Sequence, residues 1–356
     1  MTMIECRKLI KNYGTLTAVS DISLHLREQE FISILGPSGC GKSTLLRLIA
    51  GLEVPSAGQV FLKDKEISGK KISLPPERRR FGMIFQDFAL FPHLSVEGNI
   101  AFGVNGSASE KQQRVKELLK LVSLPHLAKK MPHQISGGEQ QRIAVARALA
   151  PRPRLILMDE PFSNLDYQLR QQLRRDIRKI LKHEGVATIL VTHDQVEAIT
   201  FSDRVLLMHD GKLVQSGTPE EIYQQPQTLW ASSFVGEANH INVEWQAPAL
   251  NSPFGLLGVP EKIGKDTRVL MVRPEDFVLE SSADAETNGV VKTVDFSGSV
   301  QTIGVELKSG ETVQVSGSPH LLWTPEDSVK ITAERYLCFD SAGNRLNGFS
   351  SVYAST

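Results

Sequence analysis

The segment GPSGCGKST, residues 36–44, constrains the fold of this chain more than any other part of the sequence. It follows the apolar run FISIL and precedes KSTLLRLIAG, whose leucines and isoleucine recur at helical spacing. A strand, a glycine-rich turn and a helix in this order form a phosphate-binding loop, in which glycines let successive backbone N–H groups surround an anion. The sequence therefore predicts that residues 36–44 hold a phosphate chain at the start of a helix.

Every residue of this loop is a candidate nucleotide contact. Lys42 can reach β- and γ-phosphate oxygens, and the Ser43 hydroxyl can hold Mg²⁺. The pattern should arise by chance in about one in a hundred chains of this length, and the flanking strand and helix reduce that chance further. We expect a nucleotide site formed by Gly36, Pro37, Ser38, Gly39, Cys40, Gly41, Lys42, Ser43 and Thr44.

Other apolar runs predict an α/β fold around this loop. The runs LILM (155–158), ATILVT (187–192) and RVLLM (204–208) resemble strands buried on both faces, as in parallel sheets. Between the first two runs, Leu169, Leu173 and Ile177 recur at helical spacing, so strand, helix and strand alternate. Residues 109–122 predict a further helix, in an inserted helical lobe.

Polar side chains follow several of these strands. Asp159 and Glu160 end the 155–158 run, where the carboxyl edge of such a sheet binds ligands, so Asp159 suits Mg²⁺ and Glu160 suits polarisation of a water. His193 follows the next strand and suits a γ-phosphate contact, and Gln86 follows another apolar run and suits Mg²⁺ or water. Alone, each would more often be a surface or packed residue. The phosphate loop on the same sheet favours the catalytic interpretation.

A second glycine pair opens the helix of ISGGEQQRIAVARALA, residues 135–150. Ser136 and Glu139 fit the S-x-x-E capping box, in which each side chain bonds the other residue's backbone. Gly137 and Gly138 leave the backbone N–H groups open to an anion, so we expect a second anion site that completes a nucleotide site on another chain. The alternative is a helix cap beside close packing.

Composition places few further limits on this chain of 356 residues. Its 40 basic and 40 acidic residues balance, which does not favour nucleic acid as a partner. Three widely spaced cysteines indicate a reducing compartment and no disulfide framework. The sequence has neither a signal-like apolar start nor an apolar stretch long enough to span a membrane, so we expect a soluble cytosolic chain.

The order GPSGCGKST, Gln86, ISGGEQQR, LILMDE, SNLD and VTHD resembles the nucleotide-binding subunit of an ABC transporter, over about residues 3 to 235. The resemblance implies that ATP and Mg²⁺ bind, that Tyr13 stacks on adenine and that Gln86 senses Mg²⁺ and a transmembrane partner. It also implies that residues 136–138 touch the γ-phosphate of a second copy and that Asp166 lies at the dimer interface. Glu139 stands where the usual signature motif has glutamine.

After residue 240 the runs VQTIGVEL, ETVQV and SVKITA are short and often alternating, which predicts a small all-β barrel or sandwich. Together with FVGEANHINVEW and MVRPEDFVL, they resemble the C-terminal TOBE-like, OB-like β domain of bacterial importer ATPases. We expect an α/β P-loop ATPase domain over residues 1–238, with a helical lobe at about 87–150, and the β domain over 239–356.

The resemblance implies an ATPase that energises import from the cytoplasmic face of a bacterial inner membrane. Its partners would be a second copy, arranged head-to-tail, transmembrane permease subunits and, indirectly, an extracytoplasmic solute-binding protein. The segments GEAN and RPED are closest to the ferric-ion and neighbouring polyamine or sulfate branches. We expect ferric ion as the solute, with polyamine, sulfate and sugar importers as alternatives. A soluble ABC ATPase or a regulatory module not coupled to transport is the alternative of another class.

Overall fold

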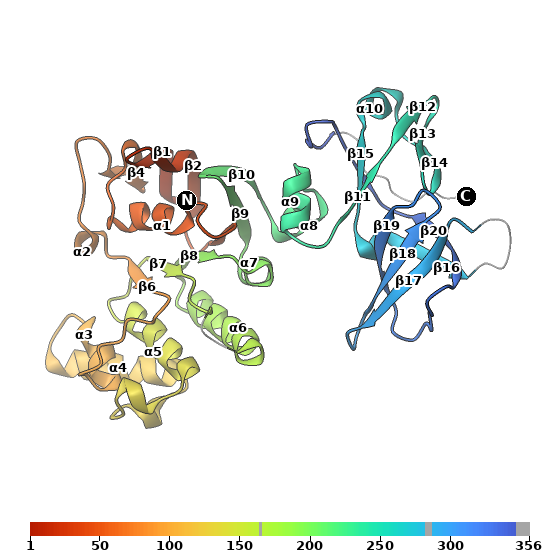
Figure 1. Ribbon diagram of the computed structural model, residues 1–356. Coiled ribbons are helices and arrows are strands. Elements are labelled where there is room, and N and C mark those ends of the chain that lie inside the picture. The colour runs from red at the N-terminus through yellow and green to blue at the C-terminus, as the bar shows by residue number, and fades with distance from the viewer. Residues whose placement is uncertain (164–165, 282–286, 347–356) are drawn as a thin grey trace. The chain divides into compact units, whose positions relative to one another are not determined.

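The computed structural model describes residues 1–163, 166–281 and 287–346, and Figure 1 shows the course of the chain. Residues 164–165 of the SNLD motif and the last ten residues of the predicted β domain lie outside the described residues. The chain divides into two compact units, Met1–Glu220 and Glu221–Thr356. Within the described residues, no helix has the length and apolar character needed to cross a membrane.

The first unit is built on the predicted parallel sheet, in the order β10-β9-β3-β8-β7-β6. All neighbours pair in parallel except β9 and β10, which form a hairpin. Every residue of β3 and β8 is buried, as the continuous apolar runs predict. The strands are β3 (Phe31–Leu35), β6 (Gly82–Ile84), β7 (Leu155–Asp159), β8 (Ala187–Thr192), β9 (Arg204–His209) and β10 (Lys212–Gly217).

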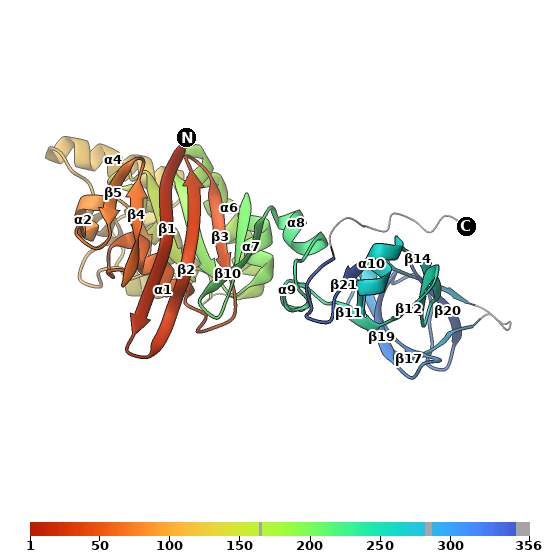
Figure 2. The same cartoon turned by 90° about the horizontal axis from the view of Figure 1, so that it is seen from above.

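An antiparallel sheet, in the order β2-β1-β4-β5, covers the phosphate-loop helix α1 (Lys42–Ala50). Figure 2 shows its long strands from above. Buried residues of α1 share one hydrophobic core with this sheet and with the parallel strands β3, β7 and β8. Its strands are β1 (Thr2–Tyr13), β2 (Leu16–Arg27), β4 (Ala57–Leu62) and β5 (Lys65–Ser68).

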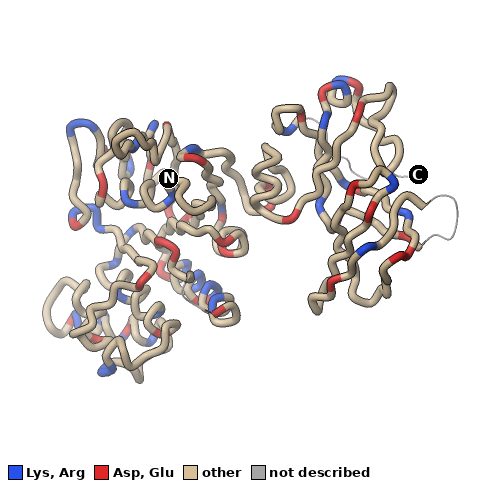
Figure 3. The backbone as a smooth tube through the Cα atoms, viewed as in Figure 1, with Lys and Arg blue, Asp and Glu red and all other residues tan. Residues whose placement is uncertain are grey.

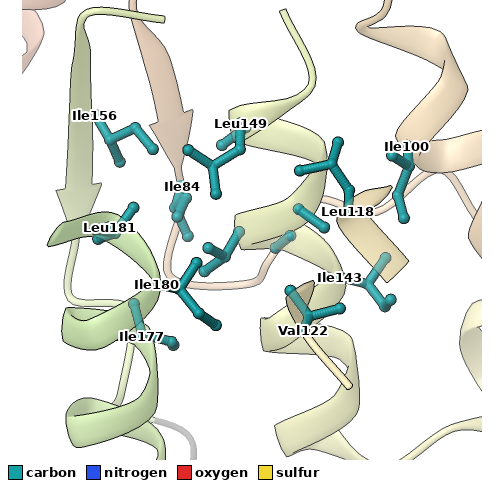
Figure 4. Packing of buried hydrophobic residues seen from close by; sticks show 14 of the residues in the cluster. Ile84, Ile100, Leu118, Val122, Ile143, Leu149, Ile156, Ile177, Ile180 and Leu181 are labelled. Carbon is teal, nitrogen blue, oxygen red and sulfur yellow. The ribbon is translucent and has the colours of Figure 1, made fainter. Parts of the chain in front are cut away.

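Helices on the other side of the parallel sheet share a second core with the helical lobe. Figure 4 shows Ile84 and Ile156 of the sheet beside Leu149 of the lobe and Ile177 and Leu181 of α6. This packing holds the lobe against the sheet. These helices are α3 (Val96–Phe102), α4 (Ala108–Leu121), α5 (Gly137–Leu149), α6 (Tyr167–His183) and α7 (Gln195–Phe201), with 3₁₀ turns at Pro125–Leu127 and Pro132–Gln134. The short helix α2 (Pro76–Arg79) instead contacts α1, because Arg79 donates hydrogen bonds to the Leu48 and Ile49 carbonyl oxygens.

The second unit is mainly antiparallel β structure, which confirms the prediction of a β domain. Its sheets have the orders β11-β15-β21, β12-β13-β14 and β16-β20-β17-β18-β19. The short helices are α8 (Pro219–Gln224), α9 (Leu229–Phe234) and α10 (Glu261–Asp266), with a 3₁₀ turn at Pro274–Asp276. The strands are β11 (Asn239–Asn242), β12 (Glu244–Gln246), β13 (Ala249–Ser252), β14 (Gly255–Gly258), β15 (Val269–Val272), β16 (Phe277–Ser281), β17 (Gly289–Phe296), β18 (Gln301–Leu307), β19 (Thr312–Gly317), β20 (Ser328–Ala333) and β21 (Leu337–Phe339).

Residues 221–238 pack with the second unit, although the sequence analysis assigned them to the first. Arg273, which is 3% exposed, donates hydrogen bonds to the carbonyl oxygens of Tyr223 (2.9 Å), Ser232 (2.9 Å) and Glu237 (2.7 Å). Its guanidinium carbon also lies 4.2 Å from the centre of the Tyr223 ring. These contacts join α8 and α9 to β15, a link that apolar periodicity alone does not reveal.

Candidate functional site

The segment from Gly36 to Lys42 connects β3 to α1 and turns tightly at its glycines. Gly39 and Gly41 have φ angles of 81° and 98°, in the left-handed region that glycine tolerates best. A Cβ on Gly36 would overlap the Met208 carbonyl oxygen. Lys42 is 4% exposed, and its Nζ donates 2.8 Å hydrogen bonds to the carbonyl oxygens of Gly36 and Pro37. The Lys42 ammonium group thus bonds to the same loop that would surround a bound phosphate.

Ser43, at the start of α1, meets Asp159 at the end of β7. The Ser43 hydroxyl donates a 2.7 Å hydrogen bond to Asp159 Oδ1. A hydroxyl and a carboxylate are oxygen donors of the kind that Mg²⁺ prefers, so these two residues fit that ion. Residues 116 positions apart in the sequence are therefore brought together at this edge of the sheet.

Glu160 and His193 form the next pair along the same sheet edge. His193 Nδ1 lies 3.1 Å from Glu160 Oε2, and the two side chains are 51% and 20% exposed. Glu160 has a φ angle of 45°, which is strained for a residue other than glycine. Its backbone N–H donates to the Val191 carbonyl of β8. The two side chains are therefore accessible to solvent, while a hydrogen bond to β8 fixes the Glu160 backbone.

A buried group behind His193 was missed by the sequence analysis. The Thr192 hydroxyl accepts from the Asp194 backbone N–H (2.9 Å) and donates to Glu197 (2.6 Å). Burial raises the pKa of Glu197, and the bond from Thr192 opposes that rise. Arg170 of α6 reaches Asp194 at 3.3 Å. A capping pattern, Asp194 followed by Glu197 before an apolar helix, was the available signal in the sequence.

The remaining predicted contacts lie on other elements of the first unit. Tyr13 ends β1, is 43% exposed, and has Lys11 Nζ 4.9 Å from its ring centre. Gln86 is exposed just after β6, whose carboxyl end belongs to the same sheet as β7. Figure 1 shows α5 in the helical lobe, apart from α1. The structure thus assembles the residues around Lys42 and Glu160 but keeps the second glycine pair separate.

The start of α5 contains the predicted capping box. Ser136 Oγ accepts from the Glu139 backbone N–H at 3.4 Å, and Glu139 Oε2 accepts from the Ser136 backbone N–H at 2.8 Å. The bond from the Ser136 backbone N–H, together with a 2.7 Å bond from the Ser136 hydroxyl to Glu139 Oε2, holds the pKa of Glu139 below its usual value. A Cβ on Gly138 would lie 3.1 Å from methyl groups of Leu169 and Leu173, so this glycine is also packed closely against α6.

Asp166 also caps a helix, because its Oδ1 accepts from the Leu169 backbone N–H at 3.0 Å. The residue therefore begins α6, directly after the undescribed part of the SNLD motif. Its cap fixes one end of the helix that packs against Gly138. Asp166 therefore has a structural role within its own chain, in addition to any contact with another chain.

Comparisons with known proteins agree with this geometry. The ABC transporter family model matches residues 19–163, and the TOBE domain model matches residues 270–339. The Fe(3+) ions import ATP-binding protein FbpC 2 of Pectobacterium atrosepticum is 44% identical over 313 residues, which cover 87% of this chain and 90% of that protein. The chain belongs to the ATP-binding subunits of ABC transporters. It is accordingly an ABC ATPase with a C-terminal TOBE domain.

Two further ABC proteins illustrate the breadth of the similarity. The spermidine/putrescine import ATP-binding protein PotA of Methylococcus capsulatus is 42% identical over 300 residues, covering 80% of this chain and 76% of that protein. The dimeric structure of MJ0796, a bacterial ABC transporter cassette, superposes with a TM-score of 0.54 at 34% identity, covering 61% of this chain and 99% of that chain. These matches confirm the predicted ABC ATPase fold.

Proposed function

We propose that this chain binds ATP with Mg²⁺ and hydrolyses it to energise ferric-ion import across a bacterial inner membrane. One observation carries the proposal: Lys42, the Ser43–Asp159 pair and the Glu160–His193 pair follow β3, β7 and β8 at one edge of the sheet. A site at that edge suits phosphate transfer, because the loop amides, the lysine and the carboxylates act on neighbouring atoms of one phosphate chain.

Each side chain then has a definite part in hydrolysis. Lys42 exchanges its bonds to the loop carbonyls for β- and γ-phosphate oxygens. The Glu160 carboxylate orients the attacking water and accepts its proton, while His193 contacts the γ-phosphate and keeps Glu160 in place. Ser43 and Asp159, with Gln86 as a further ligand, would hold Mg²⁺, which would supply positive charge beside the phosphate oxygens.

A second copy of the chain completes each site in this proposal. Tyr13 stacks on the adenine of its own chain's ATP, and Ser136, Gly137, Gly138 and Glu139 face the γ-phosphate bound by the partner. Asp166 lies at the interface. The dimeric structure of the MJ0796 cassette supports a two-chain arrangement, and the open helix start after Ser136 supplies the positive end of a helix dipole.

The permease contact is assigned to the surface beside Gln86. Phe85 and Phe102 are 37% and 69% exposed, which is unusual for phenylalanine. Arg147 of α5 donates hydrogen bonds to the carbonyls of Phe88 and Ala89, so the segment after Gln86 is held to the helical lobe. When the helical lobe moves, this segment moves with it and transmits the motion to permease subunits at the cytoplasmic face. A solute-binding protein acts on the same permease subunits from the outside.

Nucleic acid is a poor fit as the partner. Figure 3 shows a row of Lys and Arg along α6, the most basic element of the first unit. Two of these cations already share a carboxylate, because Arg178 and Lys182 lie 3.0 Å and 2.8 Å from Asp203 carboxylate oxygens. Nucleic-acid surfaces instead leave such cations available for phosphates.

The solute is tested by uptake. Relatives whose names specify Fe(3+) import reach 44% identity, and polyamine import proteins reach 42%, so both solutes need measuring. Deletion of the gene should abolish energy-dependent uptake of radioactive ferric ion and spare spermidine uptake. Loss of spermidine uptake alone would replace iron by a polyamine, and unchanged uptake of both would favour an ATPase not coupled to their transport.

The shared site is tested by mixing two inactive variants, Lys42→Ala and Ser136→Asp. Aspartate still caps α5 but places a negative charge where the partner's γ-phosphate would bind. In a mixed dimer one site carries both lesions and the other is intact, so ATP hydrolysis should return on mixing. Wild type mixed with Lys42→Ala measures the activity of a single site.

Ser107→Asp provides the matched control. Ser107 caps α4 in the same lobe with the same capping box, through Glu110. This substitution should leave hydrolysis unchanged by itself. If mixing restores no activity although the single-site control is active, the two-chain site is wrong.

A further inference from the structure

Gln141 lies on the second turn of α5 and is completely buried. Its side-chain Nε2 donates a 2.8 Å hydrogen bond to the backbone carbonyl oxygen of Pro161, the residue after Glu160. The bond therefore connects the helix that begins at Ser136 to the loop that carries the Glu160 carboxylate. The sequence analysis assigned no role to Gln141.

The loop that receives this bond needs to be held. Glu160 has a φ angle of 45°, and such a conformation persists only where its surroundings fix it. Its backbone N–H bonds the Val191 carbonyl at 3.0 Å, and its own carbonyl accepts from the Ser163 hydroxyl at 3.0 Å. Gln141 adds a restraint from the helical lobe, on the peptide between Pro161 and Phe162, one residue beyond the strained Glu160.

The other end of the Gln141 amide indicates why glutamine occupies this position. Its Oε1 is buried and has no hydrogen-bond partner among the described residues. An unpaired buried acceptor destabilises a fold relative to an apolar side chain of the same shape. Packing alone would therefore favour methionine or leucine here. The N–H bond to Pro161 is the interaction that only the amide supplies.

We propose that Gln141 is a positioning residue for Glu160. It holds the Pro161 peptide so that the Glu160 carboxylate faces the attacking water, and it passes movement of α5 to that carboxylate. The proposal rests on the function proposed above, in which the start of α5 meets the partner's nucleotide. ATP bound by one chain then influences, through α5 and Gln141, the Glu160 that serves the other ATP.

The test compares steady-state hydrolysis by Gln141→Met and Gln141→Glu with wild type. Both substitutions keep the length of the side chain and remove the N–H donor, although only one adds charge. Misplacement of a catalytic group by about 1 Å can cost about 100-fold in rate, so we expect kcat to fall about 10- to 100-fold. The KM for ATP should stay within about twofold, because the phosphate loop is untouched.

Gln140→Met is the matched control. Gln140 precedes Gln141 on α5, and its Nε2 donates to the Pro132 carbonyl at 3.0 Å, so this bond stays within the lobe. The control removes the same kind of bond without touching the Glu160 loop, and kcat should be retained. Thermal midpoints of all variants separate loss of folding from loss of positioning.

The outcomes distinguish this proposal from the function on which it depends. Normal kcat in both Gln141 variants, beside a collapse in Glu160→Gln, would refute the positioning role alone. Equal losses in the Gln140 and Gln141 variants would assign both bonds to lobe stability and also refute it. Normal turnover in Glu160→Gln would instead refute the proposed catalytic role of Glu160.

Discussion

The phosphate loop contains two glycines with positive φ that the structure distinguishes, Gly39 and Gly41. Gly39 has a φ angle of 81°, and no heavy atom of the described residues lies within 4 Å of a Cβ built on it. Gly41 has a φ angle of 98°, and its Cβ would overlap the Ala18 carbonyl oxygen of β2 and lie 3.0 Å from the Met208 methyl group. Alanine should therefore be tolerated much better at position 39 than at position 41.

The two costs can be worked out separately. A left-handed conformation costs a non-glycine residue about 1–2 kcal/mol, and loss of unfolded-state freedom returns about 0.4–1 kcal/mol. Gly39→Ala should therefore lower the unfolding free energy by at most about 1.5 kcal/mol. Gly41→Ala adds an overlap with rigid backbone, worth about 1–3 kcal/mol or more, for a total of about 1–5 kcal/mol.

Thermal unfolding of the purified variants measures this difference. For a domain of this size 1 kcal/mol shifts Tm by about 2–4 °C, so Gly39→Ala should lose less than about 6 °C and Gly41→Ala about 2–12 °C more than Gly39→Ala. Because Gly39→Ala keeps its fold, any loss of ATP affinity in it reports on the phosphate cradle itself. Equal Tm values for the two variants would refute the packing of Gly41 against β2.

Three other outcomes follow from the structure. Glu160→Gln should bind ATP normally yet hydrolyse it at least about 100-fold more slowly, and unchanged turnover would remove its role as the base. A chain ending at Glu220 should be more soluble and have a higher Tm than one ending at Gly236, because the longer chain exposes the buried faces of α8 and α9, including Ile222 and Ala231; the reverse order would place these helices with the ATPase unit. Burial raises the pKa of Glu197, so its contribution to stability is largest below its unfolded pKa and is lost as pH rises through its folded pKa. The Tm of Glu197→Gln relative to wild type should therefore increase between pH 5 and pH 8, and a constant difference would contradict a raised pKa.

The sequence predicts the parts of this fold in which one local pattern decides the structure. Continuous apolar runs identify the strands that are buried on both faces, and ATILVT becomes β8 from Ala187 to Thr192. The strands of the antiparallel sheet could not be predicted from an apolar pattern in this way. Strand β1 mixes buried and exposed residues irregularly, and register shifts between Cys6 and Leu9 and beyond interrupt its pairing with β2, so no strict alternation exists to be recognised.

In the candidate site, too, some residues could be predicted from the sequence and others could not. Lys42, Ser43 and Asp159 were found because each belongs to a short motif whose geometry follows from a strand end or a helix start. The bonds that support the site, such as Thr192 to Glu197, join side chains whose types are common on any surface. Their role depends on burial and direction, which tertiary packing determines and spacing along the chain does not.

Gly138 has two explanations that the motif alone does not separate. Two glycines at a helix start suggest backbone left bare for an anion, and Gly138 also packs tightly, since a Cβ on it would lie 3.1 Å from methyl groups of Leu169 and Leu173. A bulky substitution at Gly138 would therefore damage the packing of α5 on α6 before any phosphate was tested. Ser136 is the more informative position, because it is exposed and aspartate can replace it while still capping the helix. The structure thus moves the decisive experiment on the two-chain site from the glycine to the serine.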